Sequence, residues 1–91
     1  MNKVRRKELT DLLEKFESIQ SLLLDLKDGL QSVRDEEQDA FDNMPESLQE
    51  SERGEKMNTA IDALDEAISY IEDDISDVMD SVKDSIETAK E

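Results

Sequence analysis

Two rows of apolar residues, each advancing by alternating steps of three and four, constrain this chain more than any other feature. The first row is Leu9, Leu12, Phe16, Ile19, Leu23, Leu26, Leu30 and Val33. The second row is equally long and consists of Met57, Ile61, Leu64, Ile68, Ile71, Ile75, Val78 and Val82. Such steps repeat every seven residues and place a whole row on one side of an α-helix. The sequence therefore predicts two long amphipathic helices with coiled-coil-like packing.

The helix breakers suggest how the two helices are connected. Only Gly29, Pro45 and Gly54 are strong breakers, and two of them lie between the rows. So few turn formers cannot serve a sheet. We predict an all-α antiparallel hairpin, with one helix over about 3–43, a connector over about 44–54 and a second helix over about 55–89. The rows are expected to meet along their full length. Layers that pair Leu12 with Ile75 or with Val82 fit equally well, so the register stays open.

The connector carries its own signals. Pro45 ends the first helix, because the residue before a proline is pushed out of the helical region. Ser47 and Glu50 have the spacing of a capping box, which predicts a helical turn over Pro45 to Arg53. Gly54 either bends the chain or lies within the second helix at a cost of about 1 kcal/mol. The connector is either a fixed structural turn or a binding tip; in the second case the exposed candidates are Glu46, Gln49, Glu52 and Arg53.

The width of the apolar stripes predicts a homodimer. A chain of 91 residues buries only about 60 to 65% of its unfolded surface, and without Cys or His it has neither disulfides nor a zinc site of the usual kind. The stripes are also broader than two helices can cover, because six further residues widen them: Leu13, Leu22, Ala60, Ala67, Met79 and Ile86. Two hairpins packed into a four-helix bundle would bury this surface. Alternatively, these residues flank a two-helix seam or meet a different protein.

Negative charge is concentrated in the second part of the chain. The net charge is −15, yet residues 1–34 contain seven basic and six acidic side chains, and the remainder contain four basic and twenty acidic ones. One outward stripe of the second helix, which we call the acidic rail, consists of Glu66, Asp73, Asp77, Asp80, Asp84 and Glu87. Like charges at these spacings destabilise a helix by a few tenths of a kcal/mol per pair, roughly.

Three explanations for the rail remain open. The hairpin would bring the basic residues Lys3, Arg5, Arg6 and Lys7 near its far end. Strong net charge would also keep a small bundle soluble. In the third explanation, the rail imitates nucleic-acid phosphates and occupies a basic groove on another protein.

Several function classes fit the sequence poorly. Acid–base and nucleophilic catalysis most often use His or Cys, and the chain has neither. The carboxylates from Glu72 to Asp77 have the DDxxD spacing of magnesium sites in prenyl-diphosphate enzymes. Ile75 belongs to the seam, however, so no cavity is expected there, and the pattern of a calcium loop is missing. We expect no enzyme activity, no cofactor and no specific metal site.

Direct binding to nucleic acid or to a membrane is not expected either. The one basic patch, Lys3 to Lys7, has no aromatic partners, and anionic lipid would repel the second helix. The longest purely apolar run is Leu22 to Leu24, which is too short for a membrane span or a signal peptide. A cytoplasmic location is predicted.

The connector also carries a resemblance. The run EEQDAFDNMPESLQESERGE from Glu36 to Glu55, followed by AIDALDEAI from Ala60 to Ile68, resembles a pattern in small acidic proteins encoded by phages and prophages, mostly of Gram-positive bacteria. The likeness covers roughly residues 34 to 75, and its specific core is NMPESLQESER. It implies a helical hairpin and a phage setting, but no defined activity.

Two functional hypotheses follow. The first is a non-enzymatic homodimer that binds and inhibits a host nucleic-acid-handling or defence protein through its acidic surface. The second is a structural, assembly or accessory subunit of a phage complex, in which the acidity serves solubility alone.

Overall fold

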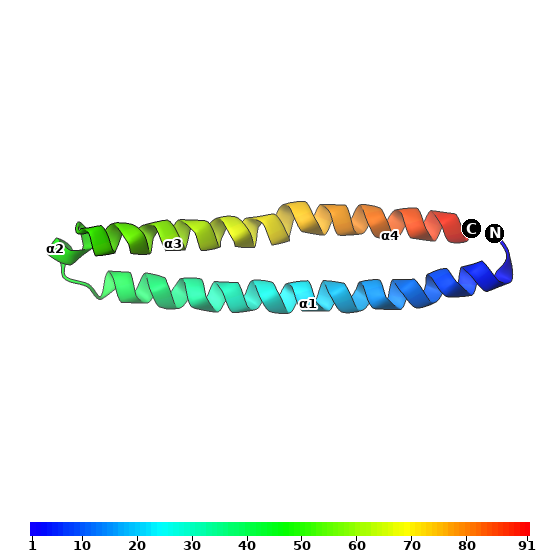
Figure 1. The fold of residues 1–91 in the computed structure, drawn as a ribbon, viewed down its shortest axis with the longest axis horizontal. Coiled ribbons are helices and arrows are strands. Elements are labelled where there is room, and N and C mark those ends of the chain that lie inside the picture. The colour runs from blue at the N-terminus through cyan, green and yellow to red at the C-terminus, as the bar shows by residue number, and fades with distance from the viewer.

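The chain folds back on itself once, near its middle, in the computed structural model of residues 1–91 (Figure 1). Helix α1 covers Lys3–Asp42 and is followed by the short helix α2, Glu46–Gln49. The return arm consists of α3, Glu52–Ser69, a π-helical turn, Tyr70–Ile75, and α4, Ser76–Lys90. The molecule measures 68 × 16 × 13 Å, and its two termini lie together at the end opposite α2. The prediction of an all-α fold is confirmed.

The connector is capped differently from the sequence prediction. Helix α2 has Pro45 at its N-cap and no side-chain cap, so the capping box of Ser47 and Glu50 is wrong. Ser51 caps α3 instead: its Oγ accepts a hydrogen bond from the backbone N–H of Gly54 at 3.4 Å and donates one to the carbonyl of Leu48. This cap satisfies one of the free N–H groups at the start of a helix. As a result, α3 begins at Glu52 rather than near residue 55.

Gly54 is a close-packing site inside α3 and does not bend the chain. It is one of the few buried residues, and a Cβ built on it would lie 2.0 Å from the carbonyl oxygen of Gln49. No other residue fits there without moving the backbone at the end of α2. The close approach of α2 and α3 therefore requires a glycine at this position, despite its low helix propensity.

Gln49 fastens the connector to α1. Its side-chain Nε2 donates to the carbonyl oxygens of Phe41 at 3.0 Å and Met44 at 3.2 Å. The last carbonyls of a helix have no partner within the helix, so the Gln49 amide caps the end of α1. The prediction that Gln49 is an exposed binding residue is wrong, since it is half-buried and used internally.

The hairpin interface uses a different row of α1 from the predicted one. The inward residues are Leu9, Leu13, Phe16, Gln20, Leu23, Lys27, Leu30 and Arg34, which still alternate steps of three and four. Leu12, Ile19, Leu26 and Val33 are 49–53% exposed, so the expectation that the full row meets the second helix is wrong for them. Long polar side chains replace them because their aliphatic stems pack inward while their charged ends reach the rim.

Two ion pairs between the arms fix the register. Arg34 Nε lies 2.8 Å from Asp65 Oδ1, and Lys27 Nζ lies 3.5 Å from Glu72 Oε1. Both arms rise about 1.5 Å per residue, so residues at equal distances from the Lys27–Glu72 pair lie level with each other. Leu12 lies fifteen residues before Lys27 and is therefore level with the region near Glu87, fifteen residues after Glu72. Both registers considered from the sequence, with Ile75 or with Val82 opposite Leu12, are therefore wrong.

The π-helical turn shifts the inward row of the return arm by one residue. Up to Ile71, the predicted residues Met57, Ile61, Leu64 and Ile68 are buried or half-buried. A π turn accommodates one extra residue, and beyond it the half-buried positions are Met79, Lys83, Ile86 and Lys90. Ile75, Val78 and Val82 are 37%, 62% and 42% exposed, so the prediction that they continue the seam within the hairpin is wrong.

Candidate functional site

One broad side of the hairpin is an apolar face. On α1, Leu12, Ile19, Leu26 and Val33 each directly precede an inward residue, as Val82 does on the return arm, and Ile75 lies seven residues before Val82. In an antiparallel helix pair these positions flank the seam on the same side of both helices. Leu22, Tyr70 and Val78 lie one turn from them on the same strips and are 51–66% exposed. The apolar face thus consists of Leu12, Ile19, Leu22, Leu26, Val33, Tyr70, Ile75, Val78 and Val82.

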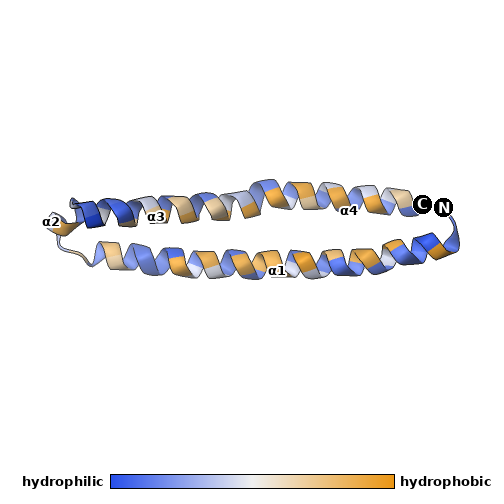
Figure 2. Cartoon of the chain, in the orientation of Figure 1, coloured by the Kyte–Doolittle hydropathy of each residue, from blue (hydrophilic) through white to orange (hydrophobic).

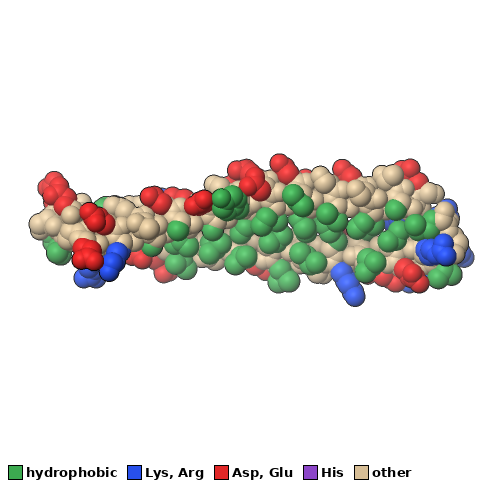
Figure 3. All heavy atoms as spheres, turned by 45° about the horizontal axis from the view of Figure 1, so that its top comes forward, with side chains coloured by type: hydrophobic (Ala, Val, Ile, Leu, Met, Phe, Trp, Pro, Cys, Tyr) green, Lys and Arg blue, Asp and Glu red, His purple; other side chains and the backbone are tan.

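The figures show how this surface is distributed. Apolar residues recur along the whole of both arms, rather than clustering at one end (Figure 2). Viewed in space-filling form, one long side carries a continuous band of hydrophobic side chains from both arms (Figure 3). Isolated exposed apolar residues are normal on protein surfaces, but a contiguous band marks an interaction surface. The sequence prediction had assigned seven of these nine residues to the seam of the hairpin, had counted Leu22 among the residues that widen the stripe, and had not included Tyr70.

The acidic rail lies exposed on the return arm, where acidic side chains follow the outer edge (Figure 3). Asp65 and Glu72 are the neighbouring carboxylates that face α1, and they are paired with Arg34 and Lys27. The rail carboxylates Asp73, Asp77, Asp80, Asp84 and Glu87 have no cationic group within 4.0 Å. The hairpin therefore neutralises its inner carboxylates and leaves the rail uncompensated.

The N-terminal cations form no ion pairs with the carboxylates of the acidic rail. The Arg6 guanidinium donates to the backbone carbonyls of Lys90 at 3.0 Å and Glu91 at 3.3 Å, and Lys7 pairs with Asp11 at 3.2 Å. The Arg6 bonds join the two ends of the chain, whereas the Lys7–Asp11 pair lies within α1, and neither reaches the rail. No ion pair within 4.0 Å joins these cations to the rail.

Two hydrogen-bonded groups beside the carboxylates have shifted pKa values. Glu66, the first residue of the rail, accepts a hydrogen bond from the Tyr70 hydroxyl at 3.0 Å. This bond and the charge of Glu66 raise the pKa of Tyr70. On the inner side, the hydrogen bond that Arg34 donates to Asp65 is the main cause that raises the pKa of Arg34. Both groups thus keep their protons more firmly than free side chains do.

The connector tip presents fewer free residues than predicted. Glu46, Glu52 and Arg53 are exposed there, and Lys56 lies 3.6 Å from Glu52 in an exposed pair. Gln49 points back to α1, as described above. The tip therefore presents mixed charges around a structurally fixed turn.

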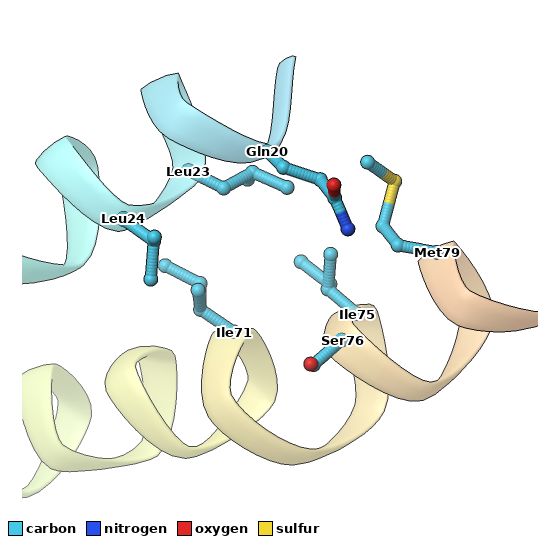
Figure 4. Close-up of a pocket in the computed structure, with 7 residues that line it drawn as sticks. All are labelled: Gln20, Leu23, Leu24, Ile71, Ile75, Ser76 and Met79. Atoms are coloured by element: carbon cyan, nitrogen blue, oxygen red, sulfur yellow. The ribbon is translucent and has the colours of Figure 1, made fainter. Parts of the chain in front are cut away.

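A shallow hollow of about 270 Å³ lies between α1 and the π-helical turn (Figure 4). Leu23 and Leu24 of α1 approach Ile71 across it, while Gln20 and Met79 close its other end. Its lining is mostly aliphatic, and the only polar side chains are those of Gln20 and Ser76. Ligand pockets typically measure roughly 300–1,000 Å³ and bury most of their ligand, so this shallow hollow lies below the usual size.

The helices provide neither a carboxylate cluster for a metal ion nor a membrane span. No group of three or more carboxylates is arranged to hold a metal ion, which includes the carboxylates from Glu72 to Asp77. None of the helices is both long and apolar enough to span a bilayer.

No protein-family model, curated protein or solved structure matches this chain. The acidic rail and the apolar face therefore have to be interpreted from their own geometry.

Proposed function

We propose that this chain is a non-enzymatic interaction protein that acts as a homodimer and binds a basic protein surface through its acidic rail. In the phage setting implied by the connector, the partner is a nucleic-acid-handling or defence protein in the host cytoplasm, and binding blocks its basic groove. The observation that carries the proposal is the row of five rail carboxylates, Asp73 to Glu87, without a cation within 4.0 Å.

The spacing of the rail supports a comparison with a nucleic-acid strand. From Asp73 to Glu87 the helix rises about 21 Å, which gives one carboxylate per about 5 Å. One strand of double-stranded DNA carries a phosphate every 3.4 Å or so along its axis. The rail therefore has roughly two thirds of the linear charge density of a strand, enough to attract lysines and arginines arranged for phosphates.

If the rail binds a basic groove, the complex should be weakened by salt, by loss of the rail carboxylates and by competing nucleic acid. The tagged chain is immobilised and used to capture proteins from a bacterial lysate at about 50 mM salt, with elution up to about 500 mM. We expect captured proteins that bind nucleic acid, elute within this range and are displaced by double-stranded DNA.

The decisive variant reverses Asp73, Asp77, Asp80 and Asp84 to Lys. The matched control reverses Asp25, Asp28, Asp35 and Asp39 of α1, which changes the net charge equally. We expect capture to be lost with the rail variant and kept with the control. Capture that survives rail reversal, with the helical dichroism intact, would rule the proposal out.

The apolar face favours a second candidate function, namely an assembly or accessory subunit whose acidity only keeps it soluble. Leu12, Ile19 and Val78 are 49–62% exposed on a side that carries no rail residue. Under this alternative, substitutions in the apolar face abolish capture and rail reversal has no effect.

A further inference from the structure

The hairpin alone buries very little. Only Phe16, Ile61 and Ile68 form a buried apolar core in a chain of 91 residues. A core this small cannot offset the conformational entropy of ordering two long helices. The apolar face is the largest remaining source of burial, so an occupant for it is required.

We propose that a second copy of this chain covers the apolar face, related to the first by a two-fold axis parallel to the long axis of the hairpin. In this arrangement α1 of each copy lies against α3 and α4 of the other, and both connectors lie at the same end. The inference rests on the homodimer of the proposed function and adds its interface and symmetry. A two-fold axis across the hairpin is the competing arrangement, which sets α1 against α1 and puts the connectors at opposite ends.

Charge repulsion favours the parallel axis. Helix α1 carries seven basic and eleven acidic side chains, a net charge of −4, while residues 52–90 of the return arm carry four basic and twelve acidic ones, a net charge of −8. With the parallel axis the two acidic arms are diagonal in the bundle, and each has only α1 helices as neighbours. With the transverse axis they lie side by side, and their uncompensated carboxylates repel.

Shape complementarity favours the same axis. Gly29 lies on the strip of the apolar face between Leu26 and Val33, and a Cβ built on it would have nothing within 4 Å. A glycine inside a helix costs about 1 kcal/mol, and no contact within this chain explains it. The Lys27–Glu72 pair puts Gly29 level with Tyr70, the one exposed aromatic side chain of the face. Under the parallel axis, Tyr70 of the second copy therefore fits over Gly29.

The area is sufficient for a specific dimer. Positions 12–33 of α1 span about 32 Å at 1.5 Å per residue. Across the 16 Å breadth of the hairpin, this gives a flat area on the order of 500 Å² per copy. Two such faces reach the roughly 1,000 Å² that specific interfaces require at minimum.

The parallel axis has a functional consequence. The acidic rails then lie on opposite outer edges of the dimer, so that one dimer can contact two basic surfaces or a single two-fold symmetric partner. The five rail carboxylates from Asp73 to Glu87 stay free in both copies, because the interface uses the other side of each arm, whereas Glu66, which accepts from the Tyr70 hydroxyl, borders the interface.

The first test measures mass by analytical ultracentrifugation at micromolar concentration. The wild-type chain is expected to have the mass of a dimer. The double variant Ile19→Gln, Leu26→Gln is expected to weaken dimerisation about 100-fold. The matched control is Leu48→Gln, because Leu48 is exposed at 44% but lies in the connector, outside the apolar face. A monomeric wild-type chain would overturn the homodimer itself. A face variant that stays dimeric would overturn this interface only.

The second test measures the axis. The chain has no cysteine, so Ser47→Cys gives a single site for a spin label at the exposed connector. The parallel axis predicts a label-to-label distance of about 20–30 Å, given helix spacings near 10 Å. A distance approaching the 68 Å length of the hairpin would overturn the parallel axis while leaving the dimer intact.

A third variant separates dimerisation from folding. Gly29→Gln adds a better helix former to α1 but fills the space assigned to Tyr70 of the second copy. We expect a helical chain that dimerises less well and whose single tyrosine becomes more accessible to a fluorescence quencher. Unchanged dimerisation with unchanged quenching would show that Tyr70 does not pack on Gly29.

Discussion

The two ends of the hairpin are held together in different ways. At the connector end, Gly54, Ile61 and Ile68 are buried, and Gln49 hydrogen-bonds to the end of α1. At the terminal end, α4 contains no buried residue, and its contacts with α1 include the hydrogen bonds from Arg6 to two terminal carbonyls. The connector half therefore holds two of the three buried apolar side chains, whereas the terminal half holds only Phe16, and its stability depends more on what covers its apolar face.

The π-helical turn is the joint between these halves. Inward residues of a continuous helix repeat every seven residues, yet Ile71 and its counterpart Met79 are eight apart. A turn with one extra residue absorbs the difference, so that Met79 and Ile86 face α1 again. Without it, Val78 and Val82 would face inward, as the sequence predicted.

The largest contrast is expected from two single-residue deletions. Deletion of Asp74 should let the π turn relax to a regular α-helix with the same inward residues, and change the free energy of unfolding by less than about 1 kcal/mol. Deletion of Asp62 rotates Leu64, Ile68 and Ile71 out of the core and should cost at least about 3 kcal/mol. Urea unfolding followed by circular dichroism at one fixed protein concentration measures both. Equal losses would show that the π turn is not the joint.

A smaller effect is expected from Gly54→Ala at the connector end. A gain of about 1 kcal/mol is expected for alanine in an open helix, but here its Cβ would meet the backbone of Gln49. We expect a net loss of about 1–3 kcal/mol in the same unfolding experiment. Ala63→Gly, at an exposed position of the same helix, measures the propensity contribution alone. If Gly54→Ala stabilises the protein by the amount that Ala63→Gly destabilises it, the tight packing at the connector is incorrect.

The sequence determined the helices better than their faces. Periodicity and Pro45 predicted the two arms and the turn, because these depend on local spacing. The inward row of α1 was missed because Gln20, Lys27 and Arg34 pack by their stems, and Lys27 and Arg34 also pair at the rim, which a count of apolar residues ignores. Two further signals were available: the eight-residue spacing from Ile71 to Met79, and the unexplained Gly29. The acidic rail is exposed as predicted, since its composition alone excludes it from a core.

The smallest effect concerns Tyr70, where the π turn begins. Its hydroxyl donates to Glu66, so ionisation would place two negative charges together, and the pKa of Tyr70 lies above its ordinary value. The folded state thus holds this proton more firmly than the unfolded state. The associated stability is complete below the ordinary tyrosine pKa of about 10 and is lost as the pH rises through the raised pKa. Glu66→Gln should lower the pKa measured by tyrosinate absorbance, and Asp74→Asn, which removes the weakest contribution, should lower it less. Equal shifts of the Tyr70 pKa in the two variants would mean that Tyr70 responds to the general negative charge of the return arm. The hydrogen bond to Glu66 at the start of the π turn would then be contradicted.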